Sequence, residues 1–212
     1  MTLLCDLINN PGFIKRRCLW HFSEWFPETA YTWHESDAAG GGVTLDAAPA
    51  GLTVGGVGIT TVSQNDAGGM NKNGSLAFSN RSVFLTTAKK TILNSAINGG
   101  LRASNGDVQN PPSQCSEFHN NSGYTNIALV TGDVSAVSAT ESSTADDINW
   151  HNYRIDLNGT TNNTLTLDGA LAITKTTNLP PATYRYQPAL YAQQRSTDAM
   201  SGYFRYCEVF DK

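Results

Sequence analysis

The chain has 212 residues, of which 40% are hydrophobic and 15% charged, and its formal net charge is −4 at pH 7. The negative charge gives no electrostatic reason to bind nucleic acid or an anionic membrane, and no apolar run approaches the about 18 residues of a membrane-spanning helix. The length suits one large sandwich or barrel, and a composition rich in Ser, Thr, Asn and Gly is typical of all-β proteins with neutral exposed faces. We therefore expect one all-β domain.

Residues 1–37 are the aromatic-rich part of the chain and contain three tryptophans, Trp20, Trp25 and Trp33. We interpret this segment as an N-terminal arm and first strand, part of or docked on a sandwich formed by residues 38–212. The rings either pack one end of the sandwich or form an exposed platform that stacks on sugar rings or binds a partner protein. The basic cluster Lys15–Arg17 follows the apolar residues near Met1, which reverses the order found in a signal peptide.

Two common ligand sites are excluded. The four cysteines form no Cys-x-x-Cys pair, so we predict no clustered zinc site and expect free thiols; they are Cys5, Cys18, Cys115 and Cys207. Cys207 lies between Tyr206 and Glu208, where a small apolar thiol belongs to the core. The glycines of residues 38–75 mark turns and bulges, and no Gly-Lys-Ser/Thr follows them, so the sequence predicts no phosphate-binding loop.

The middle of the chain predicts further strands and one long loop. Residues 76–104 carry short apolar blocks that favour two or three strands, with a short helix over 88–97 as the competing interpretation. Residues 104–123 are polar and proline-bearing, which predicts a long loop broken by a short element, and long loops often carry function. Glu117 and His119 would share one face across Phe118, where they are either a general-base pair or solvated loop residues.

The last third, from Trp150 to Phe210, has the clearest strand pattern. Tyr153, Ile155 and Leu157 alternate with polar neighbours, which predicts a strand with one face on the core. Asp168-Gly169 supplies the positive φ angles that a two-residue hairpin turn needs. The pattern predicts an antiparallel meander.

This meander resembles the C-terminal half of the concanavalin A-like lectin/glucanase superfamily. The resemblance rests on a Trp150-His151 strand, the Leu167-Asp168-Gly169 hairpin, a Leu179-Pro180 turn and a last strand that ends in Phe210. It implies a jelly-roll β-sandwich of two curved antiparallel sheets. The superfamily contains lectins, laminin-G-like modules, glucanases, polysaccharide lyases and tailed-phage virion proteins, and the fold alone does not choose among them.

The catalytic motifs of the superfamily are absent from this sequence. Glucanases carry a Glu-x-Asp-x-Glu strand, and the nearest approach here is Glu35-Ser36-Asp37, which lacks a third carboxylate. The segment Tyr186–Gln193 resembles a lyase strand but has Pro188 and Leu190 in place of its Lys and Gly. We therefore predict no catalytic residues, and we read the four histidines, His21, His34, His119 and His151, as too scattered for a metal site or a triad.

The resemblance also allows calcium, with Asp146, Asp147 and Asn149 as oxygen donors before Trp150. No EF-hand-like spacing supports such a site. We therefore predict no cofactor and no metal.

The resulting hypothesis is a non-catalytic structural protein of a phage virion, a head decoration or fibre protein made in the host cytoplasm and displayed on the virion surface. It would act through contacts with other virion proteins or with further copies of itself. The alternative location is cytoplasmic or extracellular. The first alternative is a lectin-like carbohydrate-binding module, and the second is a glycoside hydrolase or polysaccharide lyase. The candidate binding residues, for partner or glycan, are Trp20, Trp25, Trp33, Tyr124 and Tyr184.

Overall fold

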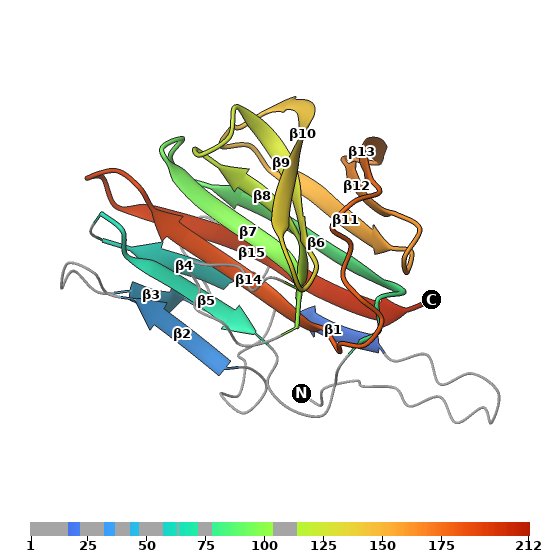
Figure 1. Cartoon of the computed structure of the whole chain (residues 1–212). Helices are drawn as coiled ribbons and strands as arrows, with labels where there is room; N and C mark the ends of the chain where they lie inside the picture. The colour runs from blue at the N-terminus through green and yellow to red at the C-terminus, as the bar shows by residue number, and fades with distance from the viewer. Residues whose placement is uncertain are drawn as a thin grey trace.

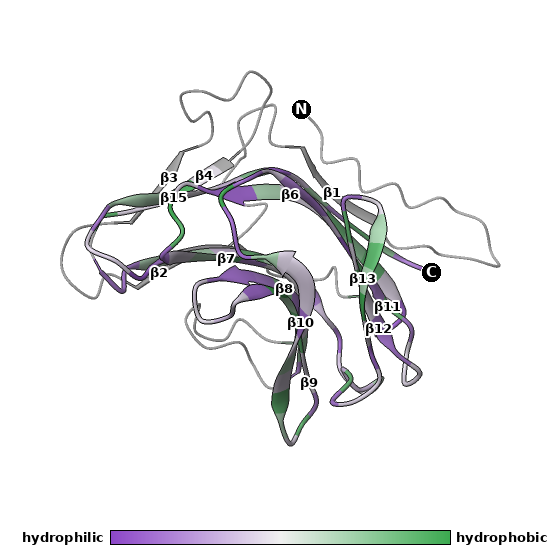
Figure 2. Ribbon diagram, turned by 90° about the horizontal axis from the view of Figure 1, so that it is seen from above, coloured by the Kyte–Doolittle hydropathy of each residue, from purple (hydrophilic) through white to green (hydrophobic). Residues whose placement is uncertain are grey.

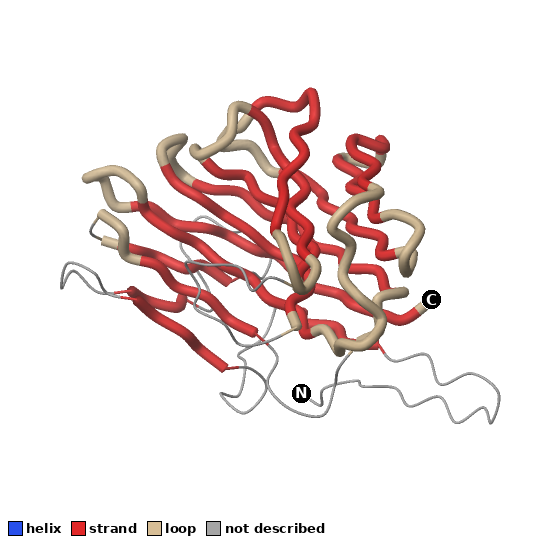
Figure 3. Tube along the Cα trace, viewed as in Figure 1, coloured by secondary structure: helices blue, strands red, loops and turns tan. Residues whose placement is uncertain are grey.

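The structure is a computed structural model and describes residues 17–21, 32–36, 43–46, 57–62, 64–71, 78–103 and 114–212. Every regular element in these ranges is a β-strand (Figures 1 and 3), and the strands form two antiparallel sheets packed face to face. The predicted all-β jelly-roll sandwich is therefore confirmed. No helix in the described ranges is long and apolar enough to cross a membrane.

The larger sheet has eight strands in the order β13-β12-β11-β6-β15-β4-β3, and β1 pairs with β15 beside this path. Its strands are β1 (Arg17–His21), β3 (Val43–Asp46), β4 (Val57–Thr61), β6 (Ser82–Lys90), β11 (His151–Leu157), β12 (Asn163–Leu167), β13 (Ala170–Lys175) and β15 (Met200–Asp211). The last strand of the chain thus lies in the middle of this sheet.

The smaller sheet has seven strands in the order β10-β9-β8-β7-β14-β5-β2. Its strands are β2 (Thr32–Ser36), β5 (Ala67–Asn71), β7 (Ser95–Arg102), β8 (Cys115–Asn121), β9 (Asn126–Gly132), β10 (Val137–Ala145) and β14 (Gln187–Gln194). Figure 2 shows both sheets bending the same way. The side of the seven-stranded sheet that faces away from the other sheet therefore lies on the inside of the bend, and we call it the concave face.

The core lies between the sheets and is built by the alternation that the strands impose. Phe118 of β8 stacks on Tyr153 of β11 with 3.7 Å between ring centroids, so one ring pair joins the two sheets. Gly202 of β15 is a point of close approach, because a Cβ there would lie 2.7 Å from Ile97 Cγ2 and 2.8 Å from Ala192 Cβ. Cys207 is 1% exposed and belongs to the core, as predicted.

The predicted C-terminal meander is confirmed for β11, β12 and β13, which pair in sequence. It does not extend to Phe210, because β14 joins the other sheet and β15 pairs with β6 and β4 instead of β13. Asp168 and Gly169 have φ angles of 49° and 85°, the two positive values that a type I′ hairpin turn requires. Tyr153, Ile155 and Leu157 are buried, and Arg154 is exposed. Local chemistry therefore determines this part of the fold.

Two expectations about the middle of the chain are settled. Residues 82–102 form β6 and β7, so the strand interpretation is confirmed and the helix over 88–97 is wrong. Residues 115–121 are the buried strand β8 and not part of a loop, while 104–113 lie outside the described residues. The short element and the shared face of Glu117 and His119 were predicted, but the full length of the strand was not. Its core-facing positions carry only one large apolar side chain, Phe118, between Ser116 and Asn120.

The N-terminal segment contributes strands to both sheets. β1 pairs with β15, and β2 pairs with β5 at the edge of the seven-stranded sheet. The domain boundary at residue 37 stays a prediction.

Candidate functional site on the concave face

The central strand of the concave face is β8. Its alternation turns Phe118 toward the core, so that Cys115, Glu117, His119 and Asn121 share the opposite face. All four are buried. A face that carries a carboxylate, an imidazole and an amide on one strand is unusual for a packed surface, because buried polar groups need partners.

Pairing with the neighbouring strands adds three more polar groups. The register places Tyr191, Asn98 and His119 side by side in one row across β14, β7 and β8. In the next row Gly100 stands opposite Glu117. Because Gly100 has no side chain, Arg102 at the end of β7 reaches diagonally past it to the carboxylate of Glu117 on β8.

Arg102 and Glu117 form a buried, two-pronged ion pair. The Nε of Arg102 donates to Oε1 of Glu117, and an Nη2 donates to Oε2 at 3.1 Å. Burial alone would raise the pKa of Glu117, but the charge of Arg102 and the hydrogen bonds to His119 and Arg102 lower it overall. The carboxylate is therefore ionised at neutral pH, and the fork geometry fixes its orientation. The Arg102 guanidinium also lies over the Tyr191 ring, 5.9 Å from its centroid.

His119 completes the cluster as a neutral imidazole. Its Nε2 lies 3.4 Å from Oε2 of Glu117, and burial lowers its pKa although Glu117 opposes the shift. With Glu117 ionised, Nε2 carries the proton and Nδ1 is a bare acceptor. That Nδ1 and the Oδ1 of Asn98 beside it are both buried, and neither has a hydrogen-bond partner among the described residues. Two adjacent acceptors without donors are the main chemical feature of this row.

The structure brings one of the predicted binding aromatics to this cluster. Tyr124 is half-buried and meets the His119 ring edge-on, with 6.0 Å between centroids. Tyr184 is 38% exposed and lies three residues before β14, toward the Arg102 end of the face. Trp20 of β1 pairs with Cys207 of β15, and Trp33 of β2 pairs with Met70 of β5. Trp25 lies outside the described residues.

Sequence reasoning brought Glu117 and His119 together but missed their partners. The structure confirms that the two side chains share a face and touch. Arg102, Asn98 and Tyr191 come from strands that are distant in sequence, so the pairing register is needed to find them. The detectable signal was the alternation of Cys115, Glu117, His119 and Asn121 through a segment that looked like loop.

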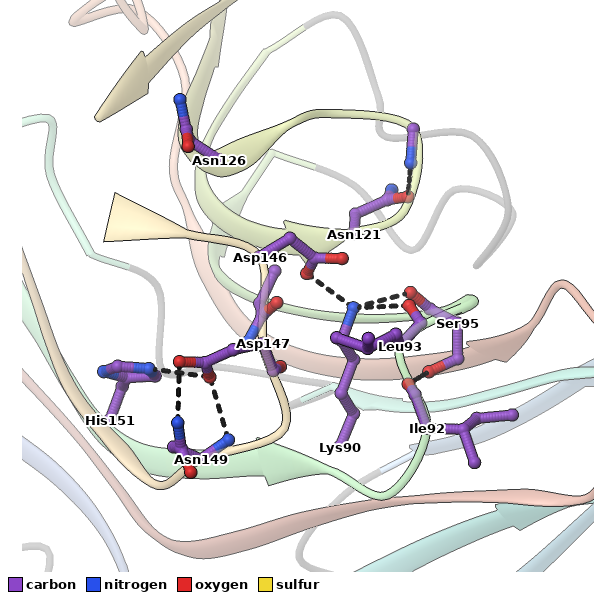
Figure 4. A network of polar contacts seen from close by, with 12 residues as sticks. Lys90, Ile92, Leu93, Ser95, Asn121, Asn126, Asp146, Asp147, Asn149 and His151 are labelled. Carbon is purple, nitrogen blue, oxygen red and sulfur yellow. Dashed lines mark hydrogen bonds and ion pairs between the residues drawn. The ribbon is translucent and has the colours of Figure 1, made fainter. Parts of the chain in front are cut away.

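A second polar network closes the Asn121 end of the sandwich (Figure 4). The ammonium of Lys90 is bound by Asp146 Oδ1 at 2.5 Å and by the carbonyls of Leu93 and Ser95 at 2.9 and 3.1 Å. The Lys90 side chain is 0% exposed. One buried cation thus joins the end of β6, the start of β7 and the segment after β10.

His151 forms the other half of this network. Its Nδ1 lies 2.6 Å from Oδ2 of Asp168, and its Nε2 lies 3.0 Å from Oδ1 of Asp147. Asp147 also accepts from the backbone and side chain of Asn149. Burial alone would lower the pKa of His151, but the hydrogen bonds to the two carboxylates raise it overall.

These contacts bear on calcium. The oxygens of Asp146 and Asp147 point to Lys90 and His151 (Figure 4), so the cationic groups of the protein already occupy them. Within the described ranges, no group of three or more His, Cys, Asp or Glu side chains is arranged to hold a metal ion. The three candidate ligands do not fit a calcium site.

The chain matches no protein-family model and no curated protein in sequence. Solved structures do resemble it. The carbohydrate recognition domain of Emp47p has a TM-score of 0.63 at 13% identity, over 91% of this chain and 94% of that one. The Crh5 transglycosylase has 0.60 at 14%, over 92% and 84%. A glycoside hydrolase family 16 endo-glucanase from Bacteroides ovatus has 0.60 at 13%, over 90% and 98%.

At these identities the likeness concerns the fold. It extends over nine-tenths of the chain and therefore includes both sheets. The protein thus has the concanavalin A-like jelly-roll fold that the C-terminal motifs indicated.

Proposed function

We propose that the protein is a carbohydrate-binding module whose concave face recognises sugar hydroxyls. The observation that carries the proposal is the pair of buried acceptors without donors, Asn98 Oδ1 and His119 Nδ1, in one cross-strand row. A buried polar atom without a partner costs about 1–3 kcal/mol, and a ligand O–H would remove that cost at both atoms. Sugars carry such donors on adjacent carbons.

The surrounding groups suit a sugar. Tyr124 stands against His119 and offers a half-buried aromatic ring, the kind of side chain that packs on the apolar face of a pyranose. Arg102 holds the Glu117 carboxylate in place, and this carboxylate in turn accepts from Nε2 of His119 and fixes the orientation of the ring. Asn98 and His119 are only 4% and 5% exposed, so we place the entry of the sugar at the Asn121 end, where Tyr124 is accessible.

The proposal is binding without turnover. Glycosidases that use two carboxyl groups keep one of them protonated with a raised pKa so that it can donate to the leaving oxygen. The pKa of Glu117 is lowered by its partners, and its oxygens are held by Arg102. This carboxylate is therefore unsuited to the role of acid. Incubation with the bound glycan should release neither reducing ends nor unsaturated products.

A glycan array followed by titration calorimetry tests the binding. Asn98→Ala should weaken the affinity about two- to tenfold, the value of one neutral hydrogen bond. Thr166→Ala, at a half-buried position of β12 in the other sheet, serves as the matched control and should change nothing. A protein that binds no glycan, or an Asn98 variant that binds like the wild type, would contradict the proposal.

The virion role expected from the sequence stays a prediction. The three similar structures named above are a carbohydrate recognition domain, a transglycosylase and an endo-glucanase, which favours the glycan module over a virion component. The two roles are separable, because a virion protein assembles in repeated copies without glycan affinity, whereas the module binds as a single chain.

A further inference from the structure

One cation at the Asn121 end of the concave face, Arg195, forms no ion pair with another described residue. Arg195 follows directly after β14 and continues the alternation of Tyr191 and Gln193, whose side of the strand is the concave face. Its side chain is half-buried, and its Nε is a buried atom without a hydrogen-bond partner among the described residues. This one N–H of the guanidinium is thus removed from water without a described protein group to replace it.

The nearby carboxylates are engaged elsewhere. Asp146 binds Lys90, and Asp147 binds His151 and Asn149. Glu117 binds Arg102. None of these acids is left for Arg195, and no ion pair between described residues includes it.

Two further acids lie on exposed positions near this end. Glu141 accepts from the backbone N–H of Asn126, and Asp198 lies in the turn after β14. Neither forms an ion pair with Arg195. Among the described residues, therefore, no ion pair neutralises the charge of Arg195.

Arg195 lies next to the groups that bind the sugar in the proposed function. A Cβ on Gly123, in the turn after β8, would be 3.2 Å from an Nη1 of Arg195, so the side chain lies against this turn because the turn has a glycine there. Burial lowers the pKa of His119 and raises the pKa of Tyr124, and the nearby positive charge of Arg195 acts to lower both. The cation, the aromatic ring and the acceptor row therefore share one end of the face.

Building on the proposed function, we propose that the ligand is an acidic glycan and that its anionic group binds Arg195. A guanidinium binds carboxylate and sulfate groups through paired N–H donors. The sugar hydroxyls would then satisfy Asn98 and His119, and the carboxylate or sulfate of the same or the next residue would satisfy Arg195. The Arg102 charge is already neutralised by Glu117, so Arg195 alone carries this selectivity among the described groups of the face.

Titration calorimetry with three probes tests the inference: a polygalacturonate oligomer, a sulfated galactan oligomer and a neutral β-glucan oligomer. The wild type should bind at least one acidic probe about tenfold or more tightly than the neutral one, and the difference should shrink as salt is raised. The polygalacturonate and sulfated probes separate a carboxylate ligand from a sulfate ligand.

Arg195→Gln should reduce the acidic affinity about tenfold or more, the loss of a charge-assisted contact, and leave neutral binding unchanged. Arg195→Lys should retain part of the affinity. Arg185→Gln removes an exposed charge just before β14, at the opposite end of the face, and serves as the matched control with an expected change below about twofold.

The outcomes separate the two proposals. If the neutral glycan binds as tightly as the acidic ones, or if Arg195→Gln binds the acidic probes like the wild type, the acidic-glycan inference is wrong, while loss of binding in Asn98→Ala would still support the module. If the wild type binds no glycan at all, both proposals fail.

Discussion

Substituting Arg102→Met removes the cation of the buried pair but keeps a side chain of similar length, and we expect a large loss of stability. Glu117 is 0% exposed and would retain the 3.4 Å contact with His119. Two charge-assisted bonds are lost, which at about 1.5–3 kcal/mol each amount to about 3–6 kcal/mol. Breaking a buried ion pair from one side typically costs about 3–5 kcal/mol. In a domain of this size the Tm should fall by about 6–20 °C.

Urea unfolding, followed by circular dichroism, measures the free energy of unfolding directly. Arg154→Met is the matched control, because Arg154 makes the same kind of fork with Asp156, at 2.6 and 3.0 Å, but is 47% exposed. Asp156 also keeps Lys212 at 2.8 Å, so the control should lose less than about 1 kcal/mol.

A double variant, Arg102→Met with Glu117→Leu, removes both charges and should recover most of the lost stability. The reasoning is refuted if Arg102→Met loses no more than Arg154→Met. It is equally refuted if the double variant is no more stable than Arg102→Met alone.

The sandwich and its end network give two further predictions. Gly202→Ala places a Cβ 2.7 Å from Ile97 Cγ2 and 2.8 Å from Ala192 Cβ, so the free energy of unfolding should fall by about 1–3 kcal/mol. Adding Ala192→Gly removes one of these contacts, so the double variant should be more stable than the sum of the two single effects predicts. The pKa of His151 is raised in the folded state, so its charge stabilises the fold below the unfolded pKa of about 6.5 and this contribution is lost as the pH rises through the folded value. The stability gap between wild type and His151→Asn, measured by urea unfolding, should therefore narrow from pH 6 to pH 8.5, and a constant gap would contradict the role of the charge.

The sequence predicts β11 and β12 well because apolar side chains alternate along both strands and turn one face to the core. Tyr153, Ile155 and Leu157 point to the core while Arg154 is exposed, and the Asp168-Gly169 turn fixes the register by its backbone conformation. In such a segment the local pattern and the final structure depend on the same chemistry.

The concave face could not be predicted in this way. In β8 the outward positions are polar but buried, and the inward ones are Ser116, Phe118 and Asn120, so hydrophobicity does not alternate. The amide of Asn120 is satisfied by the Tyr153 hydroxyl at 3.3 Å and by the carbonyl of Asp147 at 3.1 Å. A polar interior of this kind depends on partners from other strands, and no window of a single sequence contains them.

The central position of β15 constrains how the chain can assemble during synthesis. β15 lies between β6 and β4 in the eight-stranded sheet and comes last of all the strands described. Until residues 200–211 leave the ribosome, β4 and β6 have no strand between them, and the larger sheet exists as two separate halves. We therefore expect a nascent chain that stops before residue 200 to expose unpaired backbone on both halves and to require a chaperone.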